Sequence, residues 1–153
     1  MSKISQDIIQ FFLNQGYAIT STIDKNGYAH SACKDIVEMN SDGRVYLFDL
    51  YHGVTDANLE RNPHITITAV EEHKFKGYCL KGKVKTIPKG EFPEHLKKAW
   101  EARIASRLTN RLIKNLRDEK GHPAHPEANL PDPKYLIAMD VEEVVDLTPK
   151  HLK

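Results

Sequence analysis

A strand, a glycine-containing loop and a short helix follow one another in residues 42–70, and this order suits anion binding. The helix is expected to open at Thr55, shortly after Gly53 in the loop. The first N–H groups of a helix lack an internal partner, and the helix dipole favours negative charge at that end. Thr55 is also expected to cap the helix, and Asn62-Pro63 ends it because a residue before proline is disfavoured in helical conformation. The residue types therefore predict a phosphate or other anion site at this helix end.

Neither thiol chemistry nor metal binding is expected of this chain. Cys33 and Cys79 are too few for a disulfide framework, no C-x-x-C pair is present, and both are expected to be buried as small hydrophobic side chains. The segment His122-Pro-Ala-His125-Pro-Glu127 holds two imidazoles and a carboxylate, but no second cluster of ligands accompanies it. Since a closed zinc site normally has four ligands, we predict no metal site and interpret this segment as a solvated loop or a lid near a partner subunit.

The elements that must position these residues follow from periodicity and turn signals. Helical spacing of apolar residues predicts helices over 2–15 and 91–117, in addition to the short helix that opens at Thr55. Alternation and β-branched runs predict six strands, over 17–23, 28–39, 44–50, 64–70, 75–87 and 135–147. Asn26-Gly27 and Asp42-Gly43 are tight-turn signals between consecutive strands. The order predicts a mainly β fold with helices, namely a six-stranded antiparallel barrel that is closed or partly open.

Length and charge narrow the function classes. The chain has 153 residues, which is one domain over residues 1–153 by the usual length rule. Its 22 basic and 21 acidic residues give a formal charge of +1, which argues against a general nucleic-acid binder. No apolar run approaches the roughly 20 residues of a membrane span, and the apolar stretch 8–13 is not followed by a small-residue cleavage site. A cytoplasmic protein without a nucleic-acid or membrane partner is expected.

Four segments resemble the FMN-binding split-barrel superfamily, the pyridoxamine 5'-phosphate oxidase-like proteins. They are the Asn-Gly hairpin, DGRVYLF at 42–48, TDANLERNPHITI at 55–67 and GYCLKGKV at 77–84. The resemblance covers residues 12–84 well and the last strand loosely. It implies a split β-barrel with flanking helices that forms a homodimer, with FMN held at the subunit interface.

The resemblance also implies a set of cofactor-binding positions. The phosphate would be held from the second strand and from the loop before the small helix, and the isoalloxazine ring would lie near the third strand. The phosphate positions are Ser31, Ala32, Cys33, Lys34, His52, Val54, Thr55 and Asn58, and the ring positions are Asp49 and Leu50. Val54 stands where the family often has a lysine, and Asp56 brings a repelling charge. The balancing cation is therefore expected from Lys34, Arg44 or the partner chain.

The activity that the resemblance implies is an FMN-dependent oxidoreductase of unknown substrate. No acid–base pair in the sequence indicates catalytic residues. The pyridoxamine phosphate oxidase reaction itself is not expected, because the arginine and histidine substrate motif does not follow the last strand. Two alternatives share the barrel. One is a non-catalytic flavin- or heme-binding or sensing protein, with His52, His122 and His125 as heme candidates, and the other is a deazaflavin-dependent reductase.

A basic run along the predicted long helix has two interpretations. Arg103, Arg107, Arg111 and Lys114 recur at spacings of three and four, so they share one helical face. An ordinary amphipathic helix would present such residues to solvent, opposite its leucine stripe. The other interpretation is a basic wall that meets the phosphate tail of a flavin or of a reduced nicotinamide donor.

Overall fold

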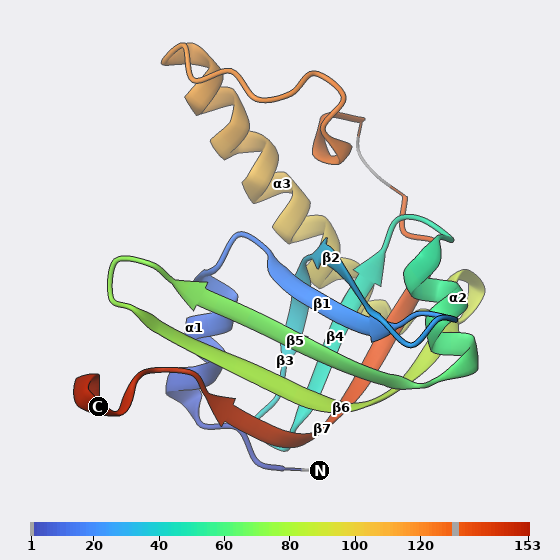
Figure 1. The fold of residues 1–153 in the computed structure, drawn as a ribbon. Coiled ribbons are helices and arrows are strands. Elements are labelled where there is room, and N and C mark those ends of the chain that lie inside the picture. The colour runs from blue at the N-terminus through green and yellow to red at the C-terminus, as the bar shows by residue number, and fades with distance from the viewer. Residues whose placement is uncertain (1, 130–131) are drawn as a thin grey trace.

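A computed structural model describes residues 2–129 and 132–153 of the chain, in which a strongly curled sheet carries helices on its outside (Figure 1). The helices are α1 (Gln6–Asn14), α2 (Val54–Arg61) and α3 (Glu94–Leu116). The strands are β1 (Ala18–Ile23), β2 (Ala29–Lys34), β3 (Ile36–Met39), β4 (Arg44–Asp49), β5 (His64–Glu71), β6 (Lys76–Pro88) and β7 (Tyr135–Asp146). None of the described helices is long and apolar enough to cross a bilayer.

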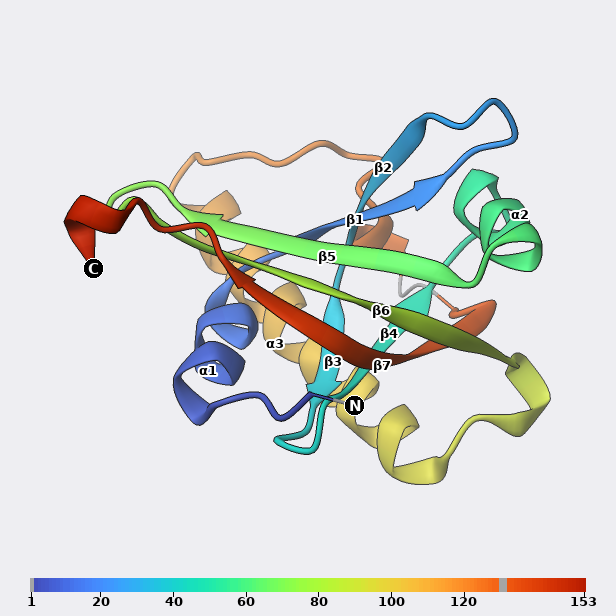
Figure 2. The same ribbon diagram turned by 60° about the horizontal axis from the view of Figure 1, so that its bottom comes forward.

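The strands form one antiparallel sheet in the order β2-β1-β5-β6-β7-β4-β3. β2 and β3 lie at opposite edges of this sheet, yet Asp35 alone separates them in the chain. The sheet must therefore curl until its two edges meet at this residue, which produces the barrel (Figure 2). The mainly β antiparallel barrel with flanking helices is confirmed.

The predicted count of six strands becomes seven because the single strand expected over 28–39 breaks at Asp35. Beyond the break the register between β3 and β4 shifts between Ile36 and Glu38, which leaves Val37 as an extra, bulged residue. Ile36 points into the barrel, whereas Asp35 and Val37 point toward α3, so neighbouring residues still face opposite sides. Lys34, Asp35, Ile36 and Val37 are all buried because both sides are covered here.

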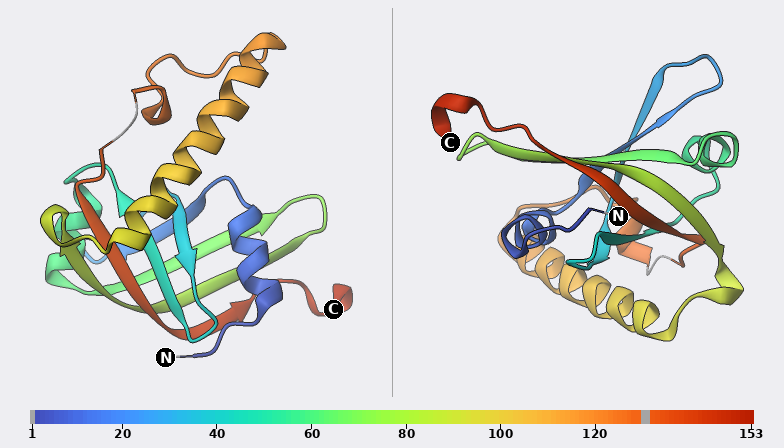
Figure 3. Two further views of the ribbon diagram at one scale, coloured as in Figure 1. Left: turned by 180° about the vertical axis from the view of Figure 1, so that it is seen from behind. Right: turned by 90° about the horizontal axis from the view of Figure 1, so that it is seen from below.

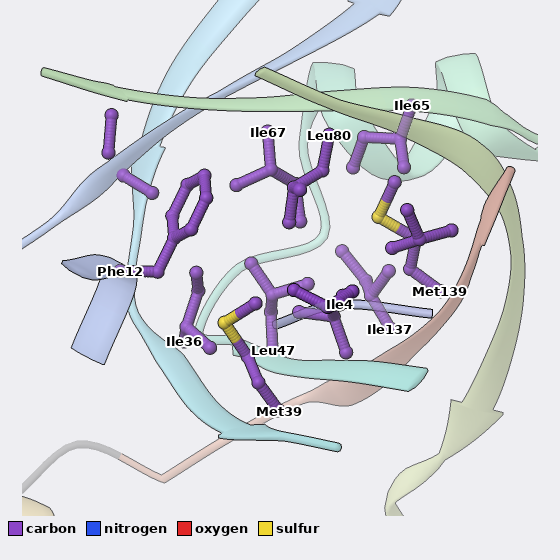
Figure 4. Packing of buried hydrophobic residues seen from close by; sticks show 14 of the residues in the cluster. Ile4, Phe12, Ile36, Met39, Leu47, Ile65, Ile67, Leu80, Ile137 and Met139 are labelled. Carbon is purple, nitrogen blue, oxygen red and sulfur yellow. The ribbon is translucent and has the colours of Figure 1, made fainter. Parts of the chain in front are cut away.

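Two apolar cores hold the layers together. The first fills the barrel, where side chains such as Phe12, Leu47, Ile67 and Leu80 point toward one another (Figure 4). The second lies outside the barrel, where α3 crosses β3, β4 and β7 (Figure 3). It consists of Val37, Phe48, Leu96, Trp100, Ile104 and Leu136. Ile36 belongs to the first core and its neighbour Val37 to the second, as the alternation of a strand requires.

The local signals for turns and caps are confirmed, with one exception. Gly27 and Gly43 adopt φ of 86° and 101°, the left-handed region that favours glycine. Ser5 caps α1, since its hydroxyl accepts a hydrogen bond from the Ile8 N–H. The predicted cap at Thr55 is wrong, because α2 begins one residue earlier and Gly53 is its N-cap. Gly53 offers no side chain to the first-turn N–H groups.

The apolar stripe of α3 is buried only along its first half. Leu96, Trp100 and Ile104 pack on the barrel, whereas Leu112 and Leu116 are largely exposed. The second half of the helix extends away from the sheet, as Figure 1 shows. Helical periodicity identified the stripe but not the point at which the barrel ends beneath it.

Candidate functional site

A cavity of about 220 Å³ opens where the ends of β2 and β4 meet α3. Five of the ten predicted cofactor positions line it, namely Ala32, Cys33, Lys34, Asp49 and Leu50. Its other walls come from Phe48, Trp100 and Ile104 of the second core and from Tyr17, Tyr51 and Arg107. The ends of β2 and β4, which are 15 residues apart in the chain, thus meet at one cavity. Its walls are mostly apolar with a few polar groups, as is usual for a ligand pocket.

A buried polar cluster forms one wall of the cavity. The Lys34 Nζ lies 2.5 Å from Asp49 Oδ2, and both side chains are more than nine-tenths buried. The Tyr135 hydroxyl donates a hydrogen bond of 2.5 Å to the same carboxylate oxygen. Burial, followed by the Asp49 contact, raises the pKa of Tyr135 well above its ordinary value. The cluster therefore holds an ammonium, a carboxylate and a neutral phenol.

A second pair connects this cluster to the beginning of α2. The His52 ring stacks on the Tyr135 ring, with centroids 5.3 Å apart and planes 19° apart. The His52 Nδ1 lies 2.6 Å from Asp56 Oδ2. The repelling charge expected from Asp56 is thus met by an imidazole within the same turn, while the N–H groups at this helix end receive no side-chain cap.

The other predicted positions lie outside the cavity wall. Asn58 is buried and its amide bridges two segments, since it donates to the Thr22 hydroxyl at 2.9 Å and accepts from Arg61 at 2.7 Å. Thr55 is buried in α2, and Val54 is half exposed. Ser31 makes a hydroxyl–hydroxyl hydrogen bond of 2.9 Å to Ser21 across the β1–β2 hairpin. α2 packs beside this hairpin (Figure 2), so Asn58 has a structural role in joining the two.

Of the two residues expected to supply positive charge to the site, Lys34 reaches the cavity and Arg44 does not. Arg44 begins β4, whereas the cavity lies at the end of that strand, about 16 Å away by strand rise. Its guanidinium pairs with Asp140 at 2.6 Å. Lys34 does reach the cavity, but its charge is already balanced by Asp49. Arg44 therefore belongs to the barrel rim and not to the cavity.

The first two residues of the basic run on α3, Arg103 and Arg107, do not face solvent as they would on an ordinary amphipathic helix. Arg103 Nε lies 2.7 Å from both carboxylate oxygens of Asp35, and Arg107 Nη2 lies 2.9 Å from one of them. The Arg107 guanidinium also stands 4.5 Å above the centre of the Tyr17 ring. Asp35 is a buried counterion between the barrel and α3.

The expectation of two buried cysteines is wrong. Cys33 is exposed at the cavity, and Cys79 is partly exposed on β6. In β2, alternate residues from Ala29 to Cys33 are exposed, so no layer covers that face of this edge strand. Strand periodicity assigned Cys33 to a face but could not show that this face lacks cover.

The histidine loop lies at the far end of α3. His122 Nδ1 accepts a hydrogen bond of 3.0 Å from the Ala124 N–H, and the His125 ring lies 6.4 Å from the Tyr17 ring. Within residues 2–129 and 132–153, no three His, Cys, Asp or Glu side chains are grouped as metal ligands would be.

Sequence reasoning missed Tyr17, Trp100 and Tyr135 as residues of the site. Tyr17 precedes its strand by one residue, Trp100 belongs to a helix stripe, and Tyr135 opens the last strand. Each has an ordinary structural explanation in its own segment. Tyr17 and Trp100 line the cavity because α3 crosses the barrel there, whereas Tyr135 contacts the cavity residue Asp49 because β7 pairs with β4.

Comparison with solved structures finds the same fold in several proteins. HupZ of Group A Streptococcus aligns with a TM-score of 0.63 over 95% of each chain at 17% identity. A putative pyridoxamine 5'-phosphate oxidase from Lactobacillus delbrueckii aligns with a TM-score of 0.62 over 95% of each chain at 12% identity. A pyridoxamine 5'-phosphate oxidase-related, FMN binding protein from Nostoc punctiforme aligns with a TM-score of 0.57 over 94% of this chain and 83% of that chain, at 14% identity. At such identities the likeness establishes the fold alone.

Comparison with protein families gives a match over nearly the whole chain. No curated protein matches the sequence. The family model described as Pyridoxamine 5'-phosphate oxidase matches residues 4–147, which include every strand of the barrel and all three α-helices. The chain belongs to the pyridoxamine 5'-phosphate oxidase family, whose members share the FMN-binding split barrel.

Proposed function

We propose that this protein binds FMN and acts as an oxidoreductase, with the isoalloxazine ring in the cavity beside Lys34 and Asp49. The observation that carries the proposal is the convergence of five predicted cofactor positions on one cavity in a chain of this family. A bound flavin would supply the electron-transfer chemistry, while the protein would supply position, local charge and exclusion of water.

The cavity residues fit an aromatic ring that carries polar edges. Phe48, Trp100 and Ile104 offer apolar walls, and Leu50 adds a fourth. The Lys34 ammonium, which Asp49 holds in place, is a fixed positive group at the polar side of the cavity. Because Asp49 balances its charge, Lys34 would serve there as a positioned hydrogen-bond donor to a polar edge of the ring.

The α2 end suits a phosphate in part. Gly53 leaves the first-turn N–H groups without a side-chain cap, and these groups can donate hydrogen bonds to an anion. The polar side chains beside them, His52 and Asp56, already contact each other. A dianionic phosphate here would need a further cation, and a second copy of the chain is the proposed source.

We propose a homodimer with the flavin at the subunit interface. A cavity of about 220 Å³ is below the roughly 300–1,000 Å³ of typical ligand pockets, which suits a site that a partner completes. Exposed Tyr51 and Val54 stand at the cavity side of the molecule, where a partner subunit could cover them. Size-exclusion chromatography with light scattering should give twice the mass of one 17.4 kDa chain, and a monomeric mass would reject the dimer.

Absorbance and titration test the cofactor. Purified protein mixed with FMN should show flavin bands after gel filtration, and Lys34→Gln should weaken FMN binding about tenfold by removing a charged contact. The single variant leaves the buried Asp49 carboxylate without its partner. The double variant Lys34→Gln/Asp49→Asn removes both charges, so its FMN affinity is measured without an unpaired buried carboxylate. Lys25→Gln, in the exposed β1–β2 turn, is the matched control.

Three outcomes would overturn the cofactor assignment. A protein that takes up no FMN, one that takes up a deazaflavin in its place, and one that shows a Soret band on heme addition each reject it. Anaerobic addition of NADH or NADPH to the FMN-loaded protein tests the oxidoreductase part. Loss of the flavin absorbance supports that part, and an unchanged spectrum with both donors argues for a binding or sensing role.

A further inference from the structure

A second and larger cleft, of about 660 Å³, lies along the basic face of α3. The end of α1 and the start of β1 form one side of it, and the segment after α3 closes the other side. Arg103, Arg107, Arg111 and Lys114 all line it. Glu119 lines it too, and Asp35 lies beneath the first two arginines, so these groups together carry two positive charges in excess.

The guanidinium groups are held in position before any ligand arrives. Arg107 is held by Asp35, by the Gly16 carbonyl and by the Tyr17 ring. Arg111 donates to the His122 carbonyl at 2.5 Å, and its Nη1 would lie 2.9 Å from a Cβ added at Gly121. The absence of a side chain at Gly121 thus makes room for Arg111. Fixed donors of this kind lose little entropy when an anion binds.

The last cation of the face differs from the arginines. Lys114 is exposed, and no carboxylate among residues 2–129 and 132–153 lies within ion-pair distance of its ammonium group. Arg107 to Lys114 spans about 10 Å of helix axis, which suits a group with two phosphates better than a single compact anion.

The cleft also communicates with the proposed flavin cavity. Tyr17 and Arg107 line both of them, so these two residues stand at the junction. A ligand whose charged end lies along α3 could therefore present its uncharged end to the cavity. This is the geometry that a soluble electron donor or an anionic substrate would need.

We propose that the α3 cleft binds a small molecule carrying a diphosphate or two separate phosphates, against Arg107, Arg111 and Lys114. Anion binding in the cleft follows from the charges and geometry alone. Its role as the entry site of a reaction partner for the flavin rests on the proposed function. The arginine pair on Asp35 also joins α3 to the barrel, so the two cations that do not touch Asp35 are the informative ones to change.

Calorimetric titration with inorganic pyrophosphate tests the site. Arg111→Gln/Lys114→Gln should weaken pyrophosphate binding at least about tenfold, because two charge-assisted contacts are lost. Lys97→Gln/Lys98→Gln, an equal charge change elsewhere on α3, should leave the affinity within about twofold, since exposed charges more than about 10 Å away are screened. Citrate, a carboxylate anion of comparable charge, should bind more weakly than pyrophosphate.

Each alternative result has a defined meaning. Unchanged pyrophosphate affinity in the double variant, or no binding to the wild-type protein, overturns the cleft proposal. Tighter binding of citrate overturns the assignment to phosphates. FMN affinity should be the same in the double variant and the wild type, so a protein that binds pyrophosphate but not FMN keeps the cleft and rejects the proposed function.

Discussion

Lys34 and Tyr135 both contact one buried carboxylate oxygen of Asp49, so the effect of substituting any of the three depends on which contacts remain. Asp49 Oδ2 accepts from both the ammonium and the phenol. A buried charge is stable only when its partners remain in place, so removal of Lys34 costs more than the loss of one contact. Removal of the Tyr135 hydroxyl leaves the ion pair intact and is therefore the cleaner test.

Tyr135→Phe should lower the free energy of unfolding by about 1.5–3 kcal/mol at pH 7, the usual value of a hydrogen bond to a charged group. The raised pKa of Tyr135 also predicts a pH effect. The folded state keeps the proton while the unfolded chain releases it near pH 10, so this stability is present below about pH 10 and is lost as pH rises above it.

Denaturant unfolding at pH 7 and between pH 9 and 11 measures both effects. The loss of stability above about pH 10 should be shallower in Tyr135→Phe than in the wild type. Tyr28→Phe, at an exposed tyrosine, is the control. Parallel pH curves for the wild type and Tyr135→Phe would contradict the assigned role.

At the scale of elements, the pairing of β6 with β7 depends on a glycine at its bulge. The register between these strands shifts between Lys81 and Gly82. A Cβ added at Gly82 would lie 2.0 Å from the Asp140 carbonyl oxygen, a backbone atom that cannot move without opening the ladder. The glycine allows β6 to bend and to pair with both β5 and β7 as the barrel closes.

Gly82→Ala should destabilise the protein by about 3 kcal/mol, the upper end of overpacking costs, because the backbone itself must shift. Gly90→Ala is the matched control, since nothing lies within 4 Å of the added Cβ at that position. Thermal unfolding of the two variants gives the comparison. Equal melting temperatures would show that the strands accommodate a methyl group at the bulge.

At the scale of the whole molecule, Asp35 links barrel closure to the placement of α3. It stands at the corner where β2 becomes β3, and its carboxylate receives both Arg103 and Arg107. The same contacts set the junction between the cavity and the α3 cleft. A single carboxylate therefore connects the fold of the barrel to the shape of the cavity and of the α3 cleft.

Asp35→Asn should destabilise the protein by about 3 kcal/mol, because two partly buried guanidinium groups lose their counterion. Trp100 is the one tryptophan in the chain and lies on the face of α3 that packs on the barrel, so its fluorescence reports separation of the helix from the barrel. Asp118→Asn, at an exposed position that asparagine tolerates, is the control. Unfolding curves that match the wild type would exclude a role for Asp35 in holding α3.

The sequence alone determined the features that depend on neighbouring residues. Strand alternation and the glycines of the two tight turns are local, and each predicted its element to within a few residues. The motif around Asn58 and the strand around Gly82 identified the family, and the structure shows why those residues matter: one bridges α2 to the hairpin and the other permits the bulge.

The tertiary structure decided which elements meet. Periodicity gave Asp35 a strand face, but only the kink and the crossing of α3 bury it against two arginines. Tyr135 reaches Asp49 only because β7 pairs with β4 across 86 residues of chain. Local pattern reports the direction of a side chain relative to its own strand or helix, whereas partners, burial and charge balance depend on contacts between segments far apart in the sequence.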